Sequence, residues 1–241
     1  MTNVDLFETE TAILARASQV VAGGESDPTR YRLALEELIT SYGRLLRESR
    51  RLIARSDRTE RELNQLNSKL TQLSDELDYK AKHDNLTGAL NRGAVFERAH
   101  HYLTKSPLSL IVLDIDFFKR INDEFGHPTG DGVIRELVNR LRLALDGKGE
   151  VGRVGGEEFT VLLPGVMLGD AAIVAEKIRQ SIAQQEFACL PTRPVTASFG
   201  VSWIGLNGDF EDAYARADAA LYKAKHGGRN RVERDSQALV D

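Results

Sequence analysis

The first third of the chain carries apolar residues at the spacing of an α-helix. A first helix is predicted from about Asp5 to Val21, where apolar positions recur three to four residues apart: Leu6, Ile13, Ala17 and Val20. Gly23-Gly24 ends this pattern. Asp27-Pro28 then offers an N-cap followed by a first-turn proline, so a second helix is predicted to begin there.

The second predicted helix carries a heptad pattern that can be followed from Leu35 to Leu77. Its a positions are Leu35, Tyr42, Ser49, Ser56, Leu63, Leu70 and Leu77, and its d positions are Leu38, Leu45, Leu52, Thr59, Leu66 and Leu73. Such a narrow apolar seam is best buried against another helix of the same kind. The pattern predicts a coiled coil that forms a homodimer or higher homo-oligomer; the alternative is an amphipathic helix packed on its own globular domain.

The middle of this seam is polar and is surrounded by arginines. Ser49, Ser56 and Thr59 stand at core positions, and the neighbouring arginines are Arg44, Arg47, Arg50, Arg51, Arg55, Arg58 and Arg61. Polar core positions either weaken the register or specify the oligomeric state, and a charge run is typical of a solvated face. We hypothesise that residues 1–60 dock another protein or a second copy of the dimer. The alternative is a plain dimerisation stalk.

Strands and helices alternate after about residue 82. Residues 108–113 form a continuous apolar run, which predicts a strand buried on both faces. Apolar runs at 151–154 and 159–163 flank Gly155-Gly156, which predicts a hairpin. Further helices are predicted around 133–141, 171–182 and 213–225, and a further strand at 195–203. This order predicts an α/β fold with a mixed sheet at 82–234, after a helical region at 1–81 and before a tail at 235–241.

Composition narrows the classes of function. The chain has 241 residues, of which 41% are hydrophobic and 28% charged, with a single cysteine, Cys189. A formal net charge of -4 gives no footprint for nucleic acid, and one cysteine excludes an internal disulfide. We find no signal peptide and no apolar run of membrane-spanning length. We therefore expect a cytoplasmic protein that neither inserts into a membrane nor binds nucleic acid.

Acidic residues gather at the end of the predicted buried strand. Asp114 and Asp116 stand two residues apart, so both carboxylates would project from one face of an extended chain. Glu157-Glu158 follow the glycine pair of the predicted hairpin and could meet Asp114 at the sheet edge. Hard oxygen ligands of this kind suit Mg²⁺ or Mn²⁺ with a phosphate-bearing substrate. For either aspartate taken alone, capping of the next turn explains it equally well.

Basic residues lie near these acids in the sequence. Lys119 follows the aspartate pair, and Lys225 and Arg229 bracket the end of the last predicted helix. Cations brought to a metal-bound polyphosphate would neutralise its charge during phosphoryl or nucleotidyl transfer. The alternative for Lys225 and Arg229 is that they are helix C-terminal charges favoured by the helix dipole.

Five separated motifs of this sequence resemble the GGDEF diguanylate cyclases in order and spacing. They are DNLTGALNR at 84–92, LDIDFFKRINDEFGHPTGD at 113–131, RVGGEEF at 153–159, TASFGVS at 196–202 and ADAALYKAKHGGRN at 217–230. The resemblance covers about residues 82–234. It implies a palm-like nucleotidyl cyclase fold in which two domains, each holding one GTP, face each other and form cyclic di-GMP.

The resemblance also implies roles for individual residues. The implied metal ligands are Asp114, Glu157 and the carbonyl of Ile115, with Glu158 the adjacent acid; the general base is left open between Glu157 and Glu158. The implied guanine contacts are Asn122 and Asp131, with His127 at the nucleotide pocket. The implied triphosphate contacts are Lys119, Lys225, Arg229 and the main-chain amides around Phe117 and Phe118. Gly155 and Gly156 leave room for the α-phosphate and ribose.

Two departures from the family pattern matter. Val154 replaces a usual tyrosine, and the four positions of the Arg-x-x-Asp product-inhibition motif read Asp146, Gly147, Lys148 and Gly149. Inhibition at that site is therefore not expected. An active cyclase governed by its stalk is favoured over a silent GTP-binding scaffold, because the signature acids are present. A different cyclic dinucleotide is disfavoured by Asp131.

Overall fold

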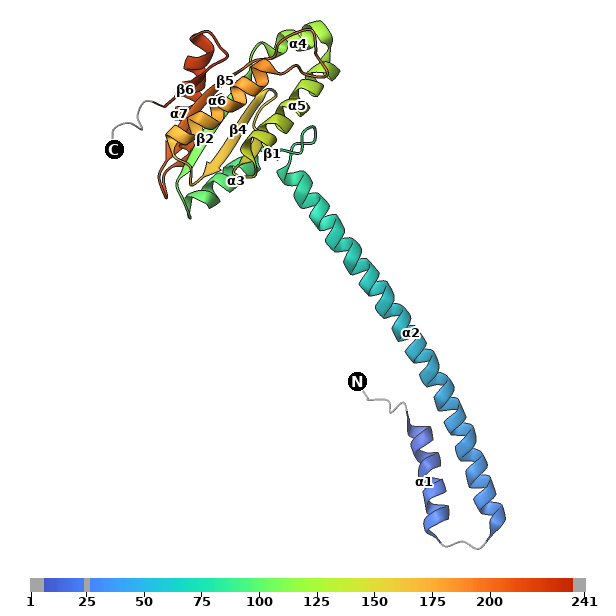
Figure 1. Cartoon of the computed structure of the whole chain (residues 1–241). Coiled ribbons are helices and arrows are strands. Elements are labelled where there is room, and N and C mark those ends of the chain that lie inside the picture. The colour runs from blue at the N-terminus through green and yellow to red at the C-terminus, as the bar shows by residue number, and fades with distance from the viewer. Residues whose placement is uncertain (1–6, 24–26, 236–241) are drawn as a thin grey trace. The chain divides into compact units, whose positions relative to one another are not determined.

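The computed structural model describes residues 7–23 and 27–235 (Figure 1). The packing of the chain divides it into two units, Met1–Ser74 and Asp75–Asp241, and each is described here by itself. The predicted helix start at Asp5-Leu6, its stop at Gly24 and most of the tail lie outside the described residues. Within the described ranges no helix is both long and apolar enough to cross a membrane.

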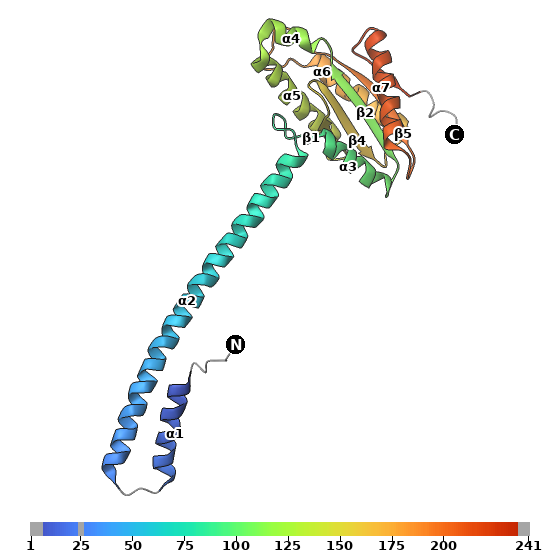
Figure 2. The ribbon, with the colours of Figure 1, turned by 180° about the vertical axis from the view of Figure 1, so that it is seen from behind.

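Two helices make up the described part of the N-terminal unit. They are α1 (Glu8–Ala22) and the start of α2 (Pro28–Lys82), and they run antiparallel to each other (Figures 1 and 2). The Oδ1 atom of Asp27 accepts a hydrogen bond of 2.9 Å from the backbone N–H of Thr29, as the predicted N-cap requires. Ile13 is buried between the helices, and ion pairs flank it: Glu10 with Arg44 at 2.7 Å and Arg16 with Glu37 at 3.2 Å.

The leucine seam of α2 is exposed in the single chain. Its last three heptads carry Leu63, Leu66, Leu70, Leu73 and Leu77, whose exposed fractions run from 46% to 67%. Apolar side chains of this size are normally buried, and a stripe of them marks an interaction surface. The seam therefore has the exposure that a helical partner would need.

The C-terminal unit is an α/β domain built on a six-stranded mixed sheet, which confirms the predicted fold class. The strands are β1 (Leu90–Asn91), β2 (Leu108–Ile115), β3 (Glu150–Arg153), β4 (Glu158–Pro164), β5 (Ala197–Ile204) and β6 (Val232–Arg234), in the sheet order β1-β3-β4-β2-β5-β6. The helices after α2 are α3 (Arg92–Leu103), α4 (Phe118–Phe125), α5 (His127–Leu145), α6 (Leu168–Gln184) and α7 (Phe210–His226). β2 pairs antiparallel with β4 and β5, whereas β1 with β3 and β5 with β6 are parallel.

Helices cover both faces of this sheet (Figures 1 and 2). Ile111 and Leu113 of β2 belong to the core shared with α5 and α6, whereas Leu110 and Val112 lie on the side of α3 and α7. Every residue of β2 is buried, as the continuous apolar run predicted. At Gly200 of β5 an added Cβ would lie 2.0 Å from the Ala217 carbonyl oxygen, so only glycine lets α7 pack this closely.

The sequence pattern gave no position for four elements: β1, α3, α4 and β6. The two strands have two and three residues, which is too short for an alternating pattern to show. Helix α4 has eight residues and follows β2 after only two intervening positions, so its apolar spacing merged with that of the strand.

Candidate active site

The register of the sheet brings the predicted acidic residues together. Asp114 of β2 stands directly opposite Glu158 of β4, and the backbone N–H of Ile115 donates to the carbonyl of Glu157 at 3.4 Å. The side chain of Asp114 is buried, Glu157 is half-buried and Glu158 is exposed. The end of β2 and the start of β4 thus place these carboxylates at one edge of the domain.

The electrostatics of these acids suit a bound cation. Burial raises the pKa of Asp114, the ion pair with Lys225 opposes this rise, and the charges of Glu158 and Asp116 add to it. Burial also raises the pKa of Glu157, as do the charges of Asp114 and Glu158. A cation between them would relieve this repulsion, and carboxylate oxygens are the ligands that Mg²⁺ and Mn²⁺ prefer.

Protein side chains alone do not complete a metal cage here. Across residues 7–23 and 27–235, no three histidine, cysteine or acidic side chains converge closely enough to hold an ion. The case for a cation at this edge therefore rests on the raised pKa values and the mutual repulsion of Asp114 and Glu157.

Lys225 contacts the implied metal ligand rather than standing apart from it. It lies in the last turn of α7, and its Nζ is 2.7 Å from Oδ2 of Asp114. From the sequence, Lys225 is expected either to contact a triphosphate or to be a helix C-terminal charge favoured by the helix dipole. In the structure it forms an ion pair with the buried carboxylate of Asp114.

The glycine pair lies in the turn between β3 and β4, as predicted. An added Cβ at Gly155 would lie 2.5 Å from Oε2 of Glu158, whereas one at Gly156 would meet nothing within 4 Å. Arg153 holds the turn by donating to the carbonyl of Gly156 at 2.7 Å and to both carboxylate oxygens of Asp84 at 3.2 Å. A side chain at Gly155 would thus displace the flexible carboxylate of Glu158, whereas Gly156 has open space around it.

The turn after β2 presents an exposed aromatic ring. Phe117 has a left-handed backbone, with φ of 58°, and the Arg229 guanidinium carbon lies 4.4 Å from the centre of its ring. Phe118, by contrast, is buried and starts α4, whose first N–H groups have no intrahelical acceptors. Lys119 is exposed on that first turn. Arg229 and Lys119 therefore flank the same turn.

The two residues assigned to guanine lie on α4 and α5, which pack against each other where they join. At Gly130 an added Cβ would lie 2.0 Å from Oδ1 of Asn122, so Asn122 packs onto the position just before Asp131. Gly126, with φ of 81°, makes the bend between the helices, and His127 is exposed at the start of α5. Gly130 is not among the predicted site residues, and only the packing of the two helices shows why it is small.

Asp116 does not share the environment of Asp114. Its buried carboxylate accepts hydrogen bonds from Thr196 Oγ1 at 2.7 Å, Ser198 Oγ at 2.7 Å and the backbone N–H of Asn230 at 3.0 Å. Three donors satisfy the charge, so Asp116 ties together the ends of three chain segments. The partners come from the TASFGVS and HGGRN motifs, whose link to Asp116 the sequence did not show.

The positions that match the product-inhibition motif form the turn between α5 and β3. Asp146 and Gly147 have left-handed backbones, with φ of 48° and 74°. The nearby Arg142 donates from Nη2 to the carbonyl of Gly88 at 2.6 Å. This turn therefore has the conformation of a helix end, with its neighbouring arginine engaged elsewhere.

Comparison with known proteins adds to this geometry. The chain is 39% identical over 166 residues to the diguanylate cyclase DgcM of Escherichia coli, a match that covers 67% of this chain and 40% of DgcM. The chain thus spans well under two thirds of that relative's length. Residues 81–231 match the family described as diguanylate cyclase, GGDEF domain.

Two solved structures resemble the chain beyond the catalytic domain. The coiled coil and GGDEF domain of DgcB from Caulobacter crescentus, in complex with c-di-GMP, has a TM-score of 0.67 and 30% identity, covering 76% of this chain and 98% of that one. The diguanylate cyclase SiaD from Pseudomonas aeruginosa, in complex with its activator SiaC, has a TM-score of 0.62 and 30% identity, covering 94% and 85%. With its motifs, its sheet and these matches in agreement, the chain belongs to the GGDEF diguanylate cyclase domain family.

Proposed function

We propose that this protein is an active diguanylate cyclase that condenses two GTP molecules into cyclic di-GMP and two pyrophosphates. The observation that carries the proposal is the pairing of Asp114 with Glu158 across β2 and β4, with Glu157 beside them. A silent GTP-binding scaffold would not need this set of mutually repelling acids.

The proposed chemistry is a nucleotidyl transfer that occurs twice. The 3′-oxygen of one GTP forms a bond to the α-phosphorus of the other, and the bond from that phosphorus to the bridging oxygen of the β-phosphate breaks. Pyrophosphate leaves, and the proton of the 3′-hydroxyl passes to Glu158 or Glu157. Repetition in the opposite sense closes the ring. Two GTP-loaded domains must therefore face each other, and their alignment supplies much of the rate.

The acids assigned to the metal are Asp114, Glu157 and Glu158, with the carbonyl oxygen of Ile115. A bound Mg²⁺ or Mn²⁺ would polarise the α-phosphate and neutralise charge on the leaving pyrophosphate. Lys119, Lys225 and Arg229, with the amides around Phe117 and Phe118, would hold the triphosphate. Asn122 and Asp131 would read the guanine edge beside His127, and Gly156 would leave room for the ribose.

The direct test is to incubate the full chain with GTP and Mg²⁺ and to separate the nucleotides by chromatography. Cyclic di-GMP and pyrophosphate should form in a ratio of about one to two, as two transfers per product demand. Binding of GTP without any such product would support the scaffold instead.

We further propose that α2 pairs with α2 of a second copy to form a homodimer. The exposed leucines of the seam support this, and the coiled coil of the related DgcB structure agrees with it. Within the C-terminal unit the end of α2 is tied to the catalytic domain, because Asn91 Nδ2 donates to the carbonyl of Ala81 at 2.6 Å. The Asp84–Arg153 contact then leads to the turn of the signature acids. A change of pairing in α2 would reach the active site by this route.

A charge in the seam should separate the two copies. We expect Leu66→Lys combined with Leu73→Lys to yield monomers by analytical ultracentrifugation, because each lysine would have to be desolvated between helices. Cyclic di-GMP formation per chain should fall roughly tenfold or more as two domains must then meet by diffusion. Ser68→Lys is the matched control, since it adds a charge on the opposite side of α2. Dimers of the double variant with full activity would contradict the proposal.

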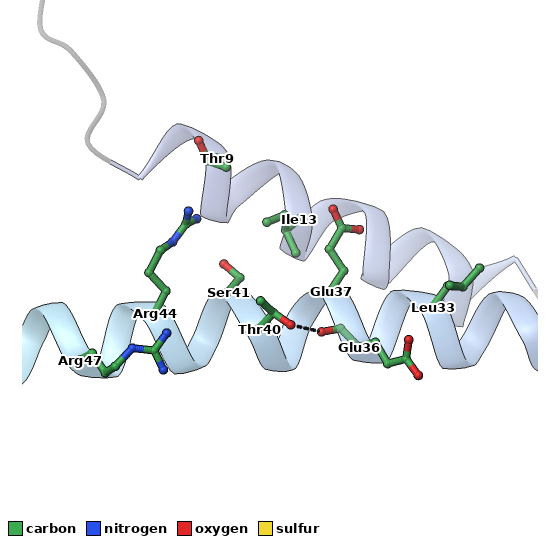
Figure 3. Close-up of a pocket in the computed structure, with 9 residues that line it drawn as sticks. All are labelled: Thr9, Ile13, Leu33, Glu36, Glu37, Thr40, Ser41, Arg44 and Arg47. Carbon is green, nitrogen blue, oxygen red and sulfur yellow. Dashed lines mark hydrogen bonds between the residues drawn. The ribbon is translucent and has the colours of Figure 1, made fainter.

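The pair formed by α1 and α2 is the proposed docking site for an activating protein. A groove of about 590 Å³ lies between these helices, lined by polar and charged side chains around Ile13 and Ser41 (Figure 3). A second, more apolar groove of about 380 Å³ lies among residues such as Val20, Tyr31 and Leu38. The similarity to SiaD, which was solved with its activator and covers 94% of this chain, supports a protein partner.

Deleting residues 1–26 removes one wall of both grooves while leaving the leucine seam in place. If docking at this site fixes an active pairing, the shortened protein should dimerise normally and lose its response to the activator. Specific activity of both forms, with and without a purified candidate partner, measures the effect. Equal activity of both forms under every condition would leave α1 and α2 as a plain dimerisation stalk. If the full chain forms tetramers and the shortened protein does not, the partner that docks at this site is a second copy of the dimer.

A further inference from the structure

The turn that follows α7 has an unfavourable backbone conformation. Arg229 and Asn230 are consecutive residues with left-handed backbones, with φ of 61° and 44°. Such conformations cost free energy for residues other than glycine and persist only where the surroundings hold them. The N–H of Arg229 bonds the carbonyl of Ala224 at 3.0 Å, which anchors the near side of the turn to the helix.

Contacts from two other elements hold the far side of this turn at Asn230. Its backbone N–H donates to Asp116 at the end of β2. Its side-chain Oδ1 accepts a hydrogen bond of 2.8 Å from Nη1 of Arg179 on α6, and the same nitrogen reaches the Asn230 carbonyl at 3.3 Å. Asn230 is thus held by one group from the sheet and one from a helix far away in sequence.

Arg179 is itself held in place before it reaches the turn. Its Nε and Nη2 donate to the two carboxylate oxygens of Glu176 at 2.8 and 2.7 Å, a two-pronged contact that fixes the plane of the guanidinium. Gln180 donates to the same carboxylate at 2.9 Å. A surface ion pair of this kind contributes little to stability, whereas its geometry orients Nη1 toward Asn230.

We propose that Arg179, held by Glu176, is a positioning residue for GTP: through Asn230 it holds the turn that places Arg229 over Phe117 and toward the triphosphate. The inference rests on the proposed role of Arg229. Arg179 has no part in the chemistry and acts only on the placement of Arg229, whose guanidinium carbon lies 4.4 Å from the centre of the Phe117 ring. The effect should therefore fall on the β- and γ-phosphates and leave guanine recognition alone.

The test compares Arg179→Ala with Lys177→Ala, which removes an exposed positive charge from the same helix. Calorimetry in EDTA, which prevents turnover, gives the dissociation constants of GTP and of GMP. Arg179→Ala should raise the dissociation constant of GTP roughly tenfold and change that of GMP by less than about twofold. The reason is that GMP lacks the two phosphates that Arg229 would contact. In turnover with Mg²⁺ the KM for GTP should rise with kcat nearly unchanged. Lys177→Ala should match the wild type in both measurements.

Two further comparisons separate positioning from general stabilisation. Asn230→Gly should keep a lower KM than Asn230→Ala, because glycine adopts the left-handed backbone without strain. Arg179→Ala should add little to Arg229→Ala in the double variant, since both remove the same contact. The proposal would be overturned if Arg179→Ala weakened the binding of GTP and of GMP equally. It would also be overturned if the effects of Arg179→Ala and Arg229→Ala on GTP binding were fully additive in the double variant. A wild-type protein that binds GTP but makes no cyclic di-GMP would instead contradict the proposed function and leave this binding test intact.

Discussion

Asp114→Asn should abolish cyclic di-GMP formation, lowering kcat by roughly 10³-fold or more, since it removes a metal ligand and its charge from the reacting phosphate. Asparagine is nearly the same size as aspartate, so the packing at the end of β2 should survive. Glu157→Ala should have a comparable effect on turnover. Nucleotide chromatography after incubation with GTP and Mg²⁺ measures both.

The stability of Asp114→Asn gives an independent readout. Burial raises the pKa of Asp114 in the folded protein, so the charged form at neutral pH costs folding free energy relative to the unfolded chain. Asparagine removes that cost and releases Lys225, which is partly exposed, to solvent. We therefore expect an unchanged or higher melting temperature by circular dichroism, together with lost activity.

Asp170→Asn serves as the control for this variant, because Asp170 is an exposed acid in the first turn of α6. Its activity should equal that of the wild type, and its melting temperature should fall slightly if at all, because only a helix N-terminal charge is lost. Substantial turnover by both Asp114→Asn and Glu157→Ala would show that these acids do not hold the metal.

Selection of GTP over ATP should depend on Asp131. Its carboxylate can accept hydrogen bonds from N1–H and the exocyclic amino group of guanine, and adenine does not present these donors in the same arrangement. Wild-type kcat/KM should favour GTP by roughly 10²-fold or more, because the wrong base leaves the Asp131 carboxylate without its hydrogen-bond donors. Asp131→Ser should lower kcat/KM for GTP, so that the values of kcat/KM for GTP and for ATP become more similar.

Asp123→Ser is the matched control for Asp131, since Asp123 is an exposed acid on α4 beside Asn122. It should keep the wild-type ratio of kcat/KM for GTP to that for ATP. An unchanged ratio in Asp131→Ser would exclude Asp131 as the residue that reads the base.

Local pattern was enough to predict the long helix, the buried strand and the hairpin. Leu63 to Leu77 repeat over three heptads, and β2 is apolar over a continuous run, so neither signal depends on distant partners. The acids at Asp114 and Glu157 were also predicted from sequence, because each stands at the end of a recognisable element. The roles of the residues that contact guanine and the triphosphate came from the resemblance to a known family. The spacing of residues along the chain does not by itself indicate these roles.

Tertiary structure decided what each of two neighbouring aspartates does. Asp114 and Asp116 are equivalent by sequence spacing, yet one pairs with Lys225 and the other is satisfied by Thr196, Ser198 and Asn230. Those partners lie 80 or more residues away, so no local pattern can indicate them. A buried charge takes its role from the donors around it, and the fold alone brings these donors together.

The same reason separates the features that the sequence determined from those that only folding decided. The heptad seam of α2 and the buried run of β2 are periodic along the chain, so the sequence by itself determined them. Gly130 against Asn122, Arg179 against Asn230 and the short strands β1 and β6 depend on segments that meet only after folding. Periodicity records which face of an element is buried, whereas close contacts between elements depend on the three-dimensional arrangement of the whole domain.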